Sequence, residues 1–269
     1  MKEAAARKPA GDTPAPRLTE LDRLAQRIAQ LAAAEPLTRV GGVVTHVTPA
    51  YVQISGLSRH LKLGDCISFS AGLTPQLGEV VRIDKGDATV KPFDASLKIG
   101  PGEVGWLHGS LSLRPHASWK GRVINALGAP IDGLGPLETG EKAYPFDADP
   151  PAALTRERVR KPLKSGVRVM DLFTPLCAGQ RIGIFAGSGV GKSTLLSMLA
   201  KSRGFDTVVL ALVGERGREV REFLEDALAQ NRSRAVTVVS TGDESPMMRR
   251  LAPKTALAIA EFYRDAGDS

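Results

Sequence analysis

A glycine-rich stretch between an apolar run and an amphipathic helix carries the clearest chemistry in this 269-residue sequence. Glycines allow several backbone N–H groups to converge on phosphate oxygens, and a helix beginning near Lys192 would add its N-terminal N–H groups. The pattern is that of a phosphate-binding P-loop, so we expect Lys192 to bind β- and γ-phosphate oxygens and Ser193 to ligate Mg²⁺. The expected nucleotide-binding residues are Ala186, Gly187, Ser188, Gly189, Val190, Gly191, Lys192, Ser193 and Thr194.

Ala186 occupies the position of the motif's first glycine. Alanine fits there if its φ is negative, which is common at the end of a strand.

A second candidate group follows the next apolar run, 207–213. A carboxylate at the C-terminal end of a parallel strand lies beside the nucleotide crevice, so Glu215 is placed to polarise an attacking water as a general base. Arg216 is a candidate to steady either the γ-phosphate or Glu215 itself. The alternative is that Glu215 and Arg216 form only an ion pair at the entry to a helix.

Alternating strands and helices must position these residues. Three apolar runs, expected as strands, alternate with helices that carry apolar residues on one face, which predicts a parallel sheet covered on both faces. The expected strands are 181–186, 207–213 and 235–240. The expected helices follow Lys192, span 220–228, and run from Pro253 in the first turn to Arg264, with Gly267 just past the end.

Composition and patterning divide the chain into four regions. Short β-branched runs separated by turn residues predict a small antiparallel barrel, with a hairpin turn at 85–87. The amphipathic helix expected at 18–36 presents either a docking face for a partner helix or a face that packs on the next domain. The regions are a disordered tail (1–17), an N-terminal amphipathic helix (18–36), a small β-barrel (37–102) and an α/β domain (103–269).

Charge and composition exclude several classes of protein. The net charge is +7, but six basic residues against one acid between Arg156 and Arg168 account for +5 of it. This segment is either a solvated linker or a contact for phosphate or a partner. With 5% aromatic residues and such confined charge, a nucleic-acid partner is not expected. Two cysteines predict neither a disulfide framework nor a metal site, and no apolar stretch is long enough to span a membrane.

Several segments resemble the flagellar and type III secretion export ATPases, which are related to the catalytic subunit of rotary ATP synthases. The similarity covers about residues 18 to 267, and that family also admits alanine at the position of Ala186. The segments that carry it are 185–193 at the P-loop, 214–223 around Glu215, 240–250, and the strand and turn at 121–133.

The resemblance implies a β-barrel, a RecA-like P-loop domain and a C-terminal helical domain. It implies an ATP hydrolase that uses Mg²⁺, with Glu215, Lys192 and Arg216 as catalytic residues. It also implies a homohexameric ring, cytoplasmic and peripheral at the inner-membrane export apparatus, that unfolds export substrates and releases their chaperones. A regulatory, stator-like export protein would bind the N-terminal helix. A virulence-type secretion ATPase and a rotary ATPase subunit are alternatives within the same resemblance.

The resemblance also implies elements that follow residue 269 in the family. These are a hydrophobic strand ending in the Walker B aspartate, the later strands and an arginine finger, which is worth about 10³–10⁵ in rate. We therefore expect a truncated form, with its RecA-like domain incomplete at the C-terminus, that binds nucleotide weakly and turns over slowly. One alternative is a nucleotide- and partner-binding remnant, and another is an RNA-translocating ring ATPase, which the confined charge disfavours.

Overall fold

The computed structural model describes residues 38–269, except 70–74, 157, 188 and 229–230. The chain divides into two units after Val40, and every element named below belongs to the second, Gly41–Ser269. The expected tail and amphipathic helix, 1–17 and 18–36, lie outside the described residues. No helix in the described part of the chain is long and apolar enough to cross a membrane.

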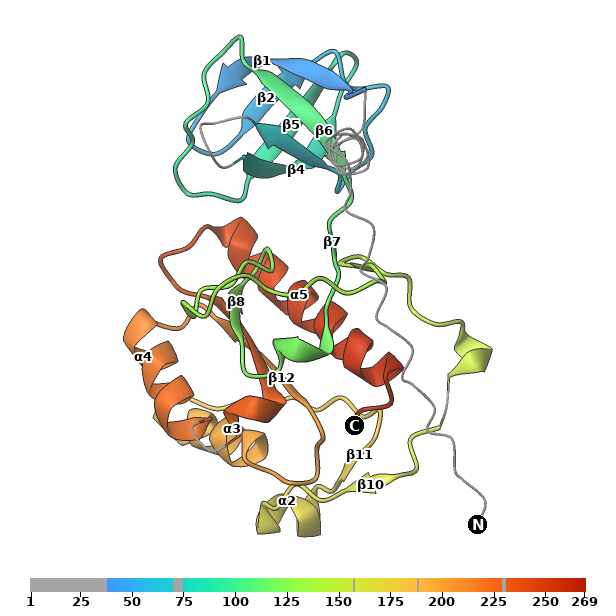
Figure 1. Cartoon of the computed structure of the whole chain (residues 1–269), viewed down its shortest axis with the longest axis vertical. Helices are drawn as coiled ribbons and strands as arrows, with labels where there is room; N and C mark the ends of the chain where they lie inside the picture. Colours follow the sequence, from blue (N-terminus) through green and yellow to red (C-terminus); the bar gives the residue numbers. More distant parts are fainter. Residues whose placement is uncertain (1–37, 70–74, 157, 188, 229–230) are drawn as a thin grey trace, which may run out of the picture. The chain divides into compact units, whose positions relative to one another are not determined.

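Six antiparallel strands close into a barrel in the order β1-β2-β5-β4-β3-β6 (Figure 1). Their bounds are β1 Gly41–Val47, β2 Val52–Ser55, β3 Cys66–Phe69, β4 Gln76–Ile83, β5 Asp87–Pro92 and β6 Val104–Gly109. Residues at alternate positions point inward, and Val44, Ile54 and Val90 are buried in the barrel core. Gly86 has a φ of 97° in the turn between β4 and β5, which confirms the expected hairpin.

The sixth barrel strand lies beyond residue 102, where the sequence predicted that the barrel would end. β6 pairs with both β1 and β3 and so closes the barrel. Its two glycines and a histidine weaken the local strand signal, because glycine is depleted in strands. Gly105 is needed at this place, since a Cβ there would lie 2.9 Å from side-chain carbons of Ile54 and Ile67.

A parallel three-stranded sheet in the order β12-β13-β8 forms the centre of the α/β region. These strands are β8 Val123–Asn125, β12 Val208–Val213 and β13 Ala235–Ser240. β12 and β13 confirm two of the expected strands, and they pair in register from Val208 opposite Ala235 to Val213 opposite Ser240. β8, from the strand-and-turn segment 121–133, adds to the far side of β13.

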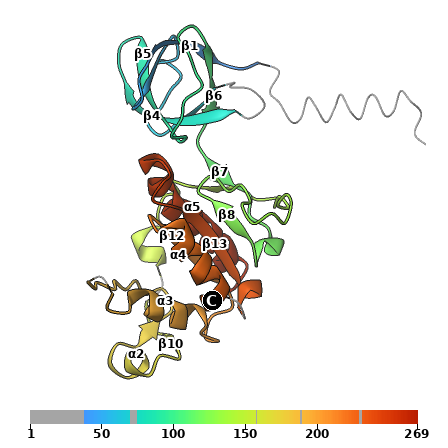
Figure 2. The same cartoon turned by 90° about the vertical axis from the view of Figure 1, so that its left-hand side faces the viewer.

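Helices cover both faces of this sheet, as expected (Figures 1 and 2). The helices are α2 Arg168–Phe173, α3 Lys192–Ala200, α4 Gly217–Glu222, which continues as a π-helical turn η3 Phe223–Ala227, and α5 Pro246–Asp265. Val236 and Val238 of β13 pack against α5, whereas Val239 packs against Val220 of α4. The two opposite faces of one strand therefore hold two helices.

Short elements complete the described chain. They are the pairs β7 Ser112–Leu113 with β9 Tyr144–Pro145 and β10 Pro162–Leu163 with β11 Leu176–Cys177, and the 3₁₀ turns η1 Ala117–Trp119, η2 Ala153–Thr155 and η4 Arg232–Arg234.

Helix α5 begins seven residues before the position that the sequence predicted. Ser245 caps it by accepting a hydrogen bond from the Met248 N–H at 3.1 Å, and Pro246 takes the first helical position. The expectation that Pro253 starts the helix is therefore wrong, because a complete N-terminal cap lies upstream. Gly267 ends the helix as expected, with a φ of 96° and an N–H bond to the Arg264 carbonyl.

The apolar run 181–186 does not form the expected strand. No described strand lies beside it, and Phe185 is 97% exposed. A strand exists only when its N–H and C=O groups pair with a neighbour, and β12, β13 and β8 pair with one another instead. Apolar composition alone was therefore not sufficient to predict a strand here.

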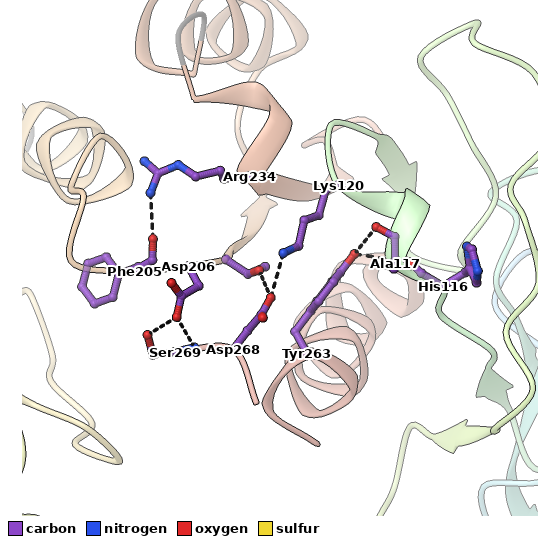
Figure 3. Close-up of polar contacts among 10 residues, drawn as sticks. His116, Ala117, Lys120, Phe205, Asp206, Arg234, Tyr263, Asp268 and Ser269 are labelled. Atoms are coloured by element: carbon purple, nitrogen blue, oxygen red, sulfur yellow. Dashed lines mark hydrogen bonds and ion pairs between the residues drawn. The ribbon is translucent and has the colours of Figure 1, made fainter. Parts of the chain in front are cut away.

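A polar network joins the end of α5 to the segment that leads into β12 (Figure 3). The Asp268 carboxylate accepts hydrogen bonds from Lys120 at 2.7 Å and from the Thr207 hydroxyl at 2.5 Å. Arg234, just before β13, donates to the Phe205 carbonyl at 2.7 Å. These bonds hold the amino ends of β12 and β13 together, at the edge of the sheet opposite to the one that ends near Glu215.

A buried ion pair stabilises the strand and turn at 121–133. Arg122 donates to Asp132 at 2.7 Å, and their side chains are 13% and 2% exposed. Asp132 also accepts from the backbone N–H groups of Val123 and Leu134. The hydrogen bonds from Arg122 and then from these backbone groups hold the pKa of Asp132 well below its usual range.

Asp132→Ala is expected to lower the free energy of unfolding by about 3 kcal/mol at pH 7, because it leaves Arg122 buried without its partner. The folded-state pKa of Asp132 is depressed, so its contribution is present above the unfolded pKa of about 3.9 and is lost as the pH falls below it. Urea denaturation of both proteins from pH 7 to pH 3 measures this.

Arg82→Ala is the matched control, since the ion pair of Arg82 with Asp84 is largely exposed and should contribute less than about 1 kcal/mol. Equal stability of Asp132→Ala and the wild type at pH 7 would contradict the prediction.

Candidate functional site

The P-loop segment leads directly into helix α3. Gly189 and Gly191 have φ values of 77° and 97°, which only glycine adopts readily, and Gly191 is the residue that caps the helix. Lys192 is the first helical residue, so the first backbone N–H groups of α3 are left for a ligand. No described residue other than glycine has a positive φ. The φ of Ala186 is therefore negative, as alanine requires at the position of the motif's first glycine.

An open cleft of about 340 Å³ brings the P-loop together with Glu215. It is lined by Gly187, Gly189, Gly191, Lys192, Ser193, Thr194 and Glu215. Ala186 and Val190 are exposed and do not line the cleft, and Ser188 lies outside the described residues. Six of the nine expected P-loop residues therefore share one cleft with the expected catalytic glutamate.

The main chain on either side of Glu215 is fixed by the last residue of β13 and the loop that follows it. Gly214, with a φ of 75°, donates its N–H to the Ser240 carbonyl at 2.7 Å. The Glu215 carbonyl accepts from the N–H of Gly242 at 3.1 Å. The end of β12 is thereby turned so that Glu215 reaches the P-loop cleft.

Arg216 does not line this cleft. It caps α4, its guanidinium donates to Glu219 at 3.2 Å, and its side chain is 73% exposed. The Arg216 backbone N–H, followed by a hydrogen bond with Glu215, lowers the pKa of Glu219. The ion pair at the helix entry that the sequence left open is therefore present, but it joins Arg216 to Glu219 rather than to Glu215.

A neighbouring groove contains residues that the sequence reasoning missed. It lies between α3 and the helix formed by α4 and η3, and it shares Ser193, Thr194 and Glu215 with the P-loop cleft. Acidic residues of the helix recur along it at helical spacing: Glu219, Glu222 and Asp226. Their spacing of three and four residues was visible in the sequence and would have placed them on one face.

The oxygen donors of the cleft suit Mg²⁺. This ion binds few protein oxygens and takes further ligands from water and substrate phosphates, a requirement that the Ser193 hydroxyl fits. Among the described residues, no group of three or more His, Cys, Asp or Glu side chains could hold a metal by itself. Any Mg²⁺ in this cleft would therefore depend on a bound nucleotide for most of its ligands.

A glycine-rich loop that opens a helix, opposite a glutamate at the end of a parallel strand, defines a P-loop nucleotide-binding protein. Residues 166–269 match the nucleotide-binding domain of the ATP synthase alpha/beta family. Residues 166–269 thus carry the match to this family, and the chain is a homologue of the flagellar and type III secretion ATPases.

Named relatives support this assignment. The chain is 49% identical over 253 residues to the flagellum-specific ATP synthase of Agrobacterium fabrum, covering 91% of this chain and 54% of the relative. It is 41% identical over 212 residues to the protein of that name from Bacillus subtilis, covering 77% and 48%. The chain thus spans about half the length of these relatives.

A solved structure shows the same fold. The assembled ATPase EscN of the enteropathogenic E. coli type III secretion system matches with a TM-score of 0.75 and 34% identity, covering 84% of this chain and 54% of EscN. The resemblance to export ATPases and the expected fold class, a β-barrel followed by an α/β nucleotide-binding region, are therefore confirmed.

Proposed function

We propose that this chain binds Mg-ATP in the cleft between the P-loop and Glu215 and carries the ATP-hydrolysing site of a protein-export ATPase. One observation carries the proposal. Two segments separated by more than twenty residues bring an ammonium (Lys192), a hydroxyl (Ser193) and a carboxylate (Glu215) into one cleft beside a helix N-terminus.

Each group has a role that its chemistry fits. The Lys192 ammonium and the free N–H groups of α3 neutralise the β- and γ-phosphates, and the Ser193 hydroxyl holds Mg²⁺. Bound Mg²⁺ neutralises phosphate charge as it develops. Glu215 orients and deprotonates the attacking water. Arg216, held by Glu219, acts on Glu215 through that neighbour or turns toward the γ-phosphate when ATP binds.

The cellular role is proposed from the relatives. The names of these relatives refer to flagella and to type III secretion. We therefore propose that ATP hydrolysis drives the unfolding of export substrates and the release of chaperones. A solved relative is described as an assembled ATPase and, in a second structure, as bound to its central stalk EscO. For this chain we propose a hexameric ring, cytoplasmic and peripheral to the inner membrane, with a stator-like partner on residues 18–36.

A second candidate function is a nucleotide-binding module with little turnover of its own. The exposed run 181–186 favours it, because the segment that leads into the P-loop has no strand to hold it among the described residues. A loop that must be ordered by its ligand binds that ligand more weakly than a preformed one. Comparing the ATP affinity and the hydrolysis rate of the 269-residue chain separates the two candidates.

Ser193→Ala tests the proposed metal contact. In the presence of Mg²⁺ it is expected to weaken ATP binding roughly tenfold or more, because a hydrogen bond or ligand to a charged group contributes about 1.5–3 kcal/mol. In EDTA the variant and the wild type should bind ATP equally. Titration of a fluorescent ATP analogue under both conditions measures this.

Ser197→Ala, one turn further along α3, is the matched control and should bind as the wild type does. Binding by the wild type that does not depend on Mg²⁺ would contradict the proposed role of Ser193.

A further inference from the structure

The loop 241–244, which joins the end of β13 to the start of α5, contacts the main chain of Glu215. The N–H of Gly242 donates to the Glu215 carbonyl at 3.1 Å. The two segments approach closely, because a Cβ on Gly242 would lie 3.4 Å from the Gly214 carbonyl oxygen. The position of this loop therefore sets where Glu215 lies in the P-loop cleft.

Ser245, which follows the loop, makes two kinds of hydrogen bond with one hydroxyl group. Its oxygen accepts from the N–H of Met248 at 3.1 Å, which caps α5. Its hydrogen is donated to the carbonyl of Phe93 at 2.5 Å, and Phe93 directly follows the barrel strand β5. The N–H of Phe93 in turn donates to the carbonyl of Leu77 in β4 at 2.9 Å. Ser245 thus joins the start of α5 to the main chain of the barrel.

Two further contacts hold the first turns of α5 to the barrel. Met248 is buried in the same apolar cluster as Phe93. Arg250 forms an ion pair with Glu79 of β4, and the side chains of the two residues are 52% and 16% exposed. Apolar contact is not directional, so the hydrogen bond from Ser245 and this ion pair fix the orientation of the helix start.

The loop between Glu215 and the barrel contact is short and bonded to itself. The hydroxyl of Ser240, a buried residue, donates to the Glu244 carboxylate at 3.0 Å. The N–H of Glu244 donates to the Thr241 carbonyl at 3.2 Å. A hydrogen-bonded loop of this kind moves as a unit, so a displacement of Ser245 reaches Gly242 instead of being absorbed on the way.

We infer that Ser245 is a positioning residue for hydrolysis, which places Glu215 by tying the loop 241–244 to the barrel. The inference rests on the proposed role of Glu215 as the general base. Misplacing a reacting group by about 1 Å lowers a rate by about 10²-fold. Lys192 and Ser193 lie on α3 and contact phosphate and Mg²⁺ without this loop. Loss of the tie therefore lowers the turnover rate and leaves the ATP affinity unchanged.

Two variants of equal size separate the tie from the helix cap. Ser245→Asp and Ser245→Asn both cap a helix as well as serine does, but only asparagine can donate to the Phe93 carbonyl. Ser245→Asp is expected to lower kcat about 10- to 100-fold while the ATP affinity stays within about twofold of the wild type. Ser245→Asn should keep kcat within about threefold of the wild type, because the donor is restored. Phosphate release measures kcat, and titration of a fluorescent ATP analogue measures the affinity.

Arg250→Ala tests the second contact without changing the cap. The Arg250 side chain is half exposed, so its truncation should leave the fold intact. It is expected to lower kcat about two- to fivefold, again without a change in ATP affinity, as the loss of a partly exposed ion pair predicts. Urea denaturation and far-UV circular dichroism verify that each variant is folded.

Amide hydrogen exchange in the nucleotide-free chain tests the tie apart from hydrolysis. The Gly242 N–H is expected to exchange about tenfold faster in Ser245→Asp than in the wild type or Ser245→Asn, since its bond to the Glu215 carbonyl opens more often. Wild-type exchange and kcat in Ser245→Asp, equal losses in the aspartate and asparagine variants, or a parallel loss of ATP affinity would overturn the inference. If the exchange differs as expected but the wild type hydrolyses ATP no faster than Lys192→Ala, the proposed function fails while the tie stands.

Discussion

Glu215→Gln is expected to lower the rate of ATP hydrolysis by about 10²–10⁴-fold while ATP affinity changes less than threefold, because glutamine cannot accept the proton of the attacking water. Glutamine keeps the size of the side chain and one oxygen that can orient water. The backbone bonds from Gly214 to Ser240 and from Gly242 to Glu215 do not involve the side chain, so the loop should hold its shape.

Release of radiolabelled phosphate measures this rate, with Lys192→Ala as the background. Glu225→Gln is the matched control, since Glu225 lies on the helix that follows Glu215 but does not line the cleft, and it should keep wild-type activity. Hydrolysis at the wild-type rate by Glu215→Gln would show that another group activates the water. Hydrolysis by the wild type no faster than the background would favour the nucleotide-binding module instead.

Lys192→Ala is expected to abolish measurable hydrolysis and to weaken ATP binding by about 100-fold. The lysine ammonium lies in the cleft at the first position of α3, where a charged contact with phosphate contributes about 3 kcal/mol. Alanine is the best helix former, so α3 should keep its structure and the loss should come from the missing charge.

Isothermal titration with Mg-ATP and the phosphate-release assay measure the two effects. Lys201→Ala, at the other end of α3, removes an exposed lysine of the same helix and should leave both values unchanged. If Lys192→Ala bound ATP as tightly as the wild type, the P-loop cleft would not be the nucleotide site. Partner binding through other surfaces should survive in this variant, which separates the enzyme from a pure interaction protein.

The sequence predicted the local elements of the nucleotide-binding region well. The strand 235–240 was predicted with its observed bounds, and 207–213 differs from β12 by one residue. The start of α3 at Lys192 followed from the glycine-rich loop. Each of these depends on residues close together in the chain, where apolar runs, turn glycines and capping groups report directly on backbone conformation.

Predictions that depended on distant partners were less successful. The barrel needed β6, whose glycines carry little strand signal and whose pairing with β1 and β3 spans dozens of residues. The run 181–186 has strand composition but no neighbour among the described strands. The start of α5 was misplaced because the choice between Pro246 and Pro253 depended on the cap that Ser245 makes in three dimensions.

The predictions about the candidate site also divide into those that depend on local sequence and those that depend on distant partners. The sequence by itself determined which groups could do phosphate chemistry, because the P-loop is one contiguous segment whose glycines, lysine and serine follow one another. The place of Glu215 beside the P-loop also followed from its position after a predicted parallel strand. Only the tertiary structure decided that Arg216 turns to Glu219 and that Glu222 and Asp226 line a groove beside the cleft. Those relations arise from the turn at Gly214 and the packing of α4 beside α3, and contacts between separate elements leave no local trace in the sequence.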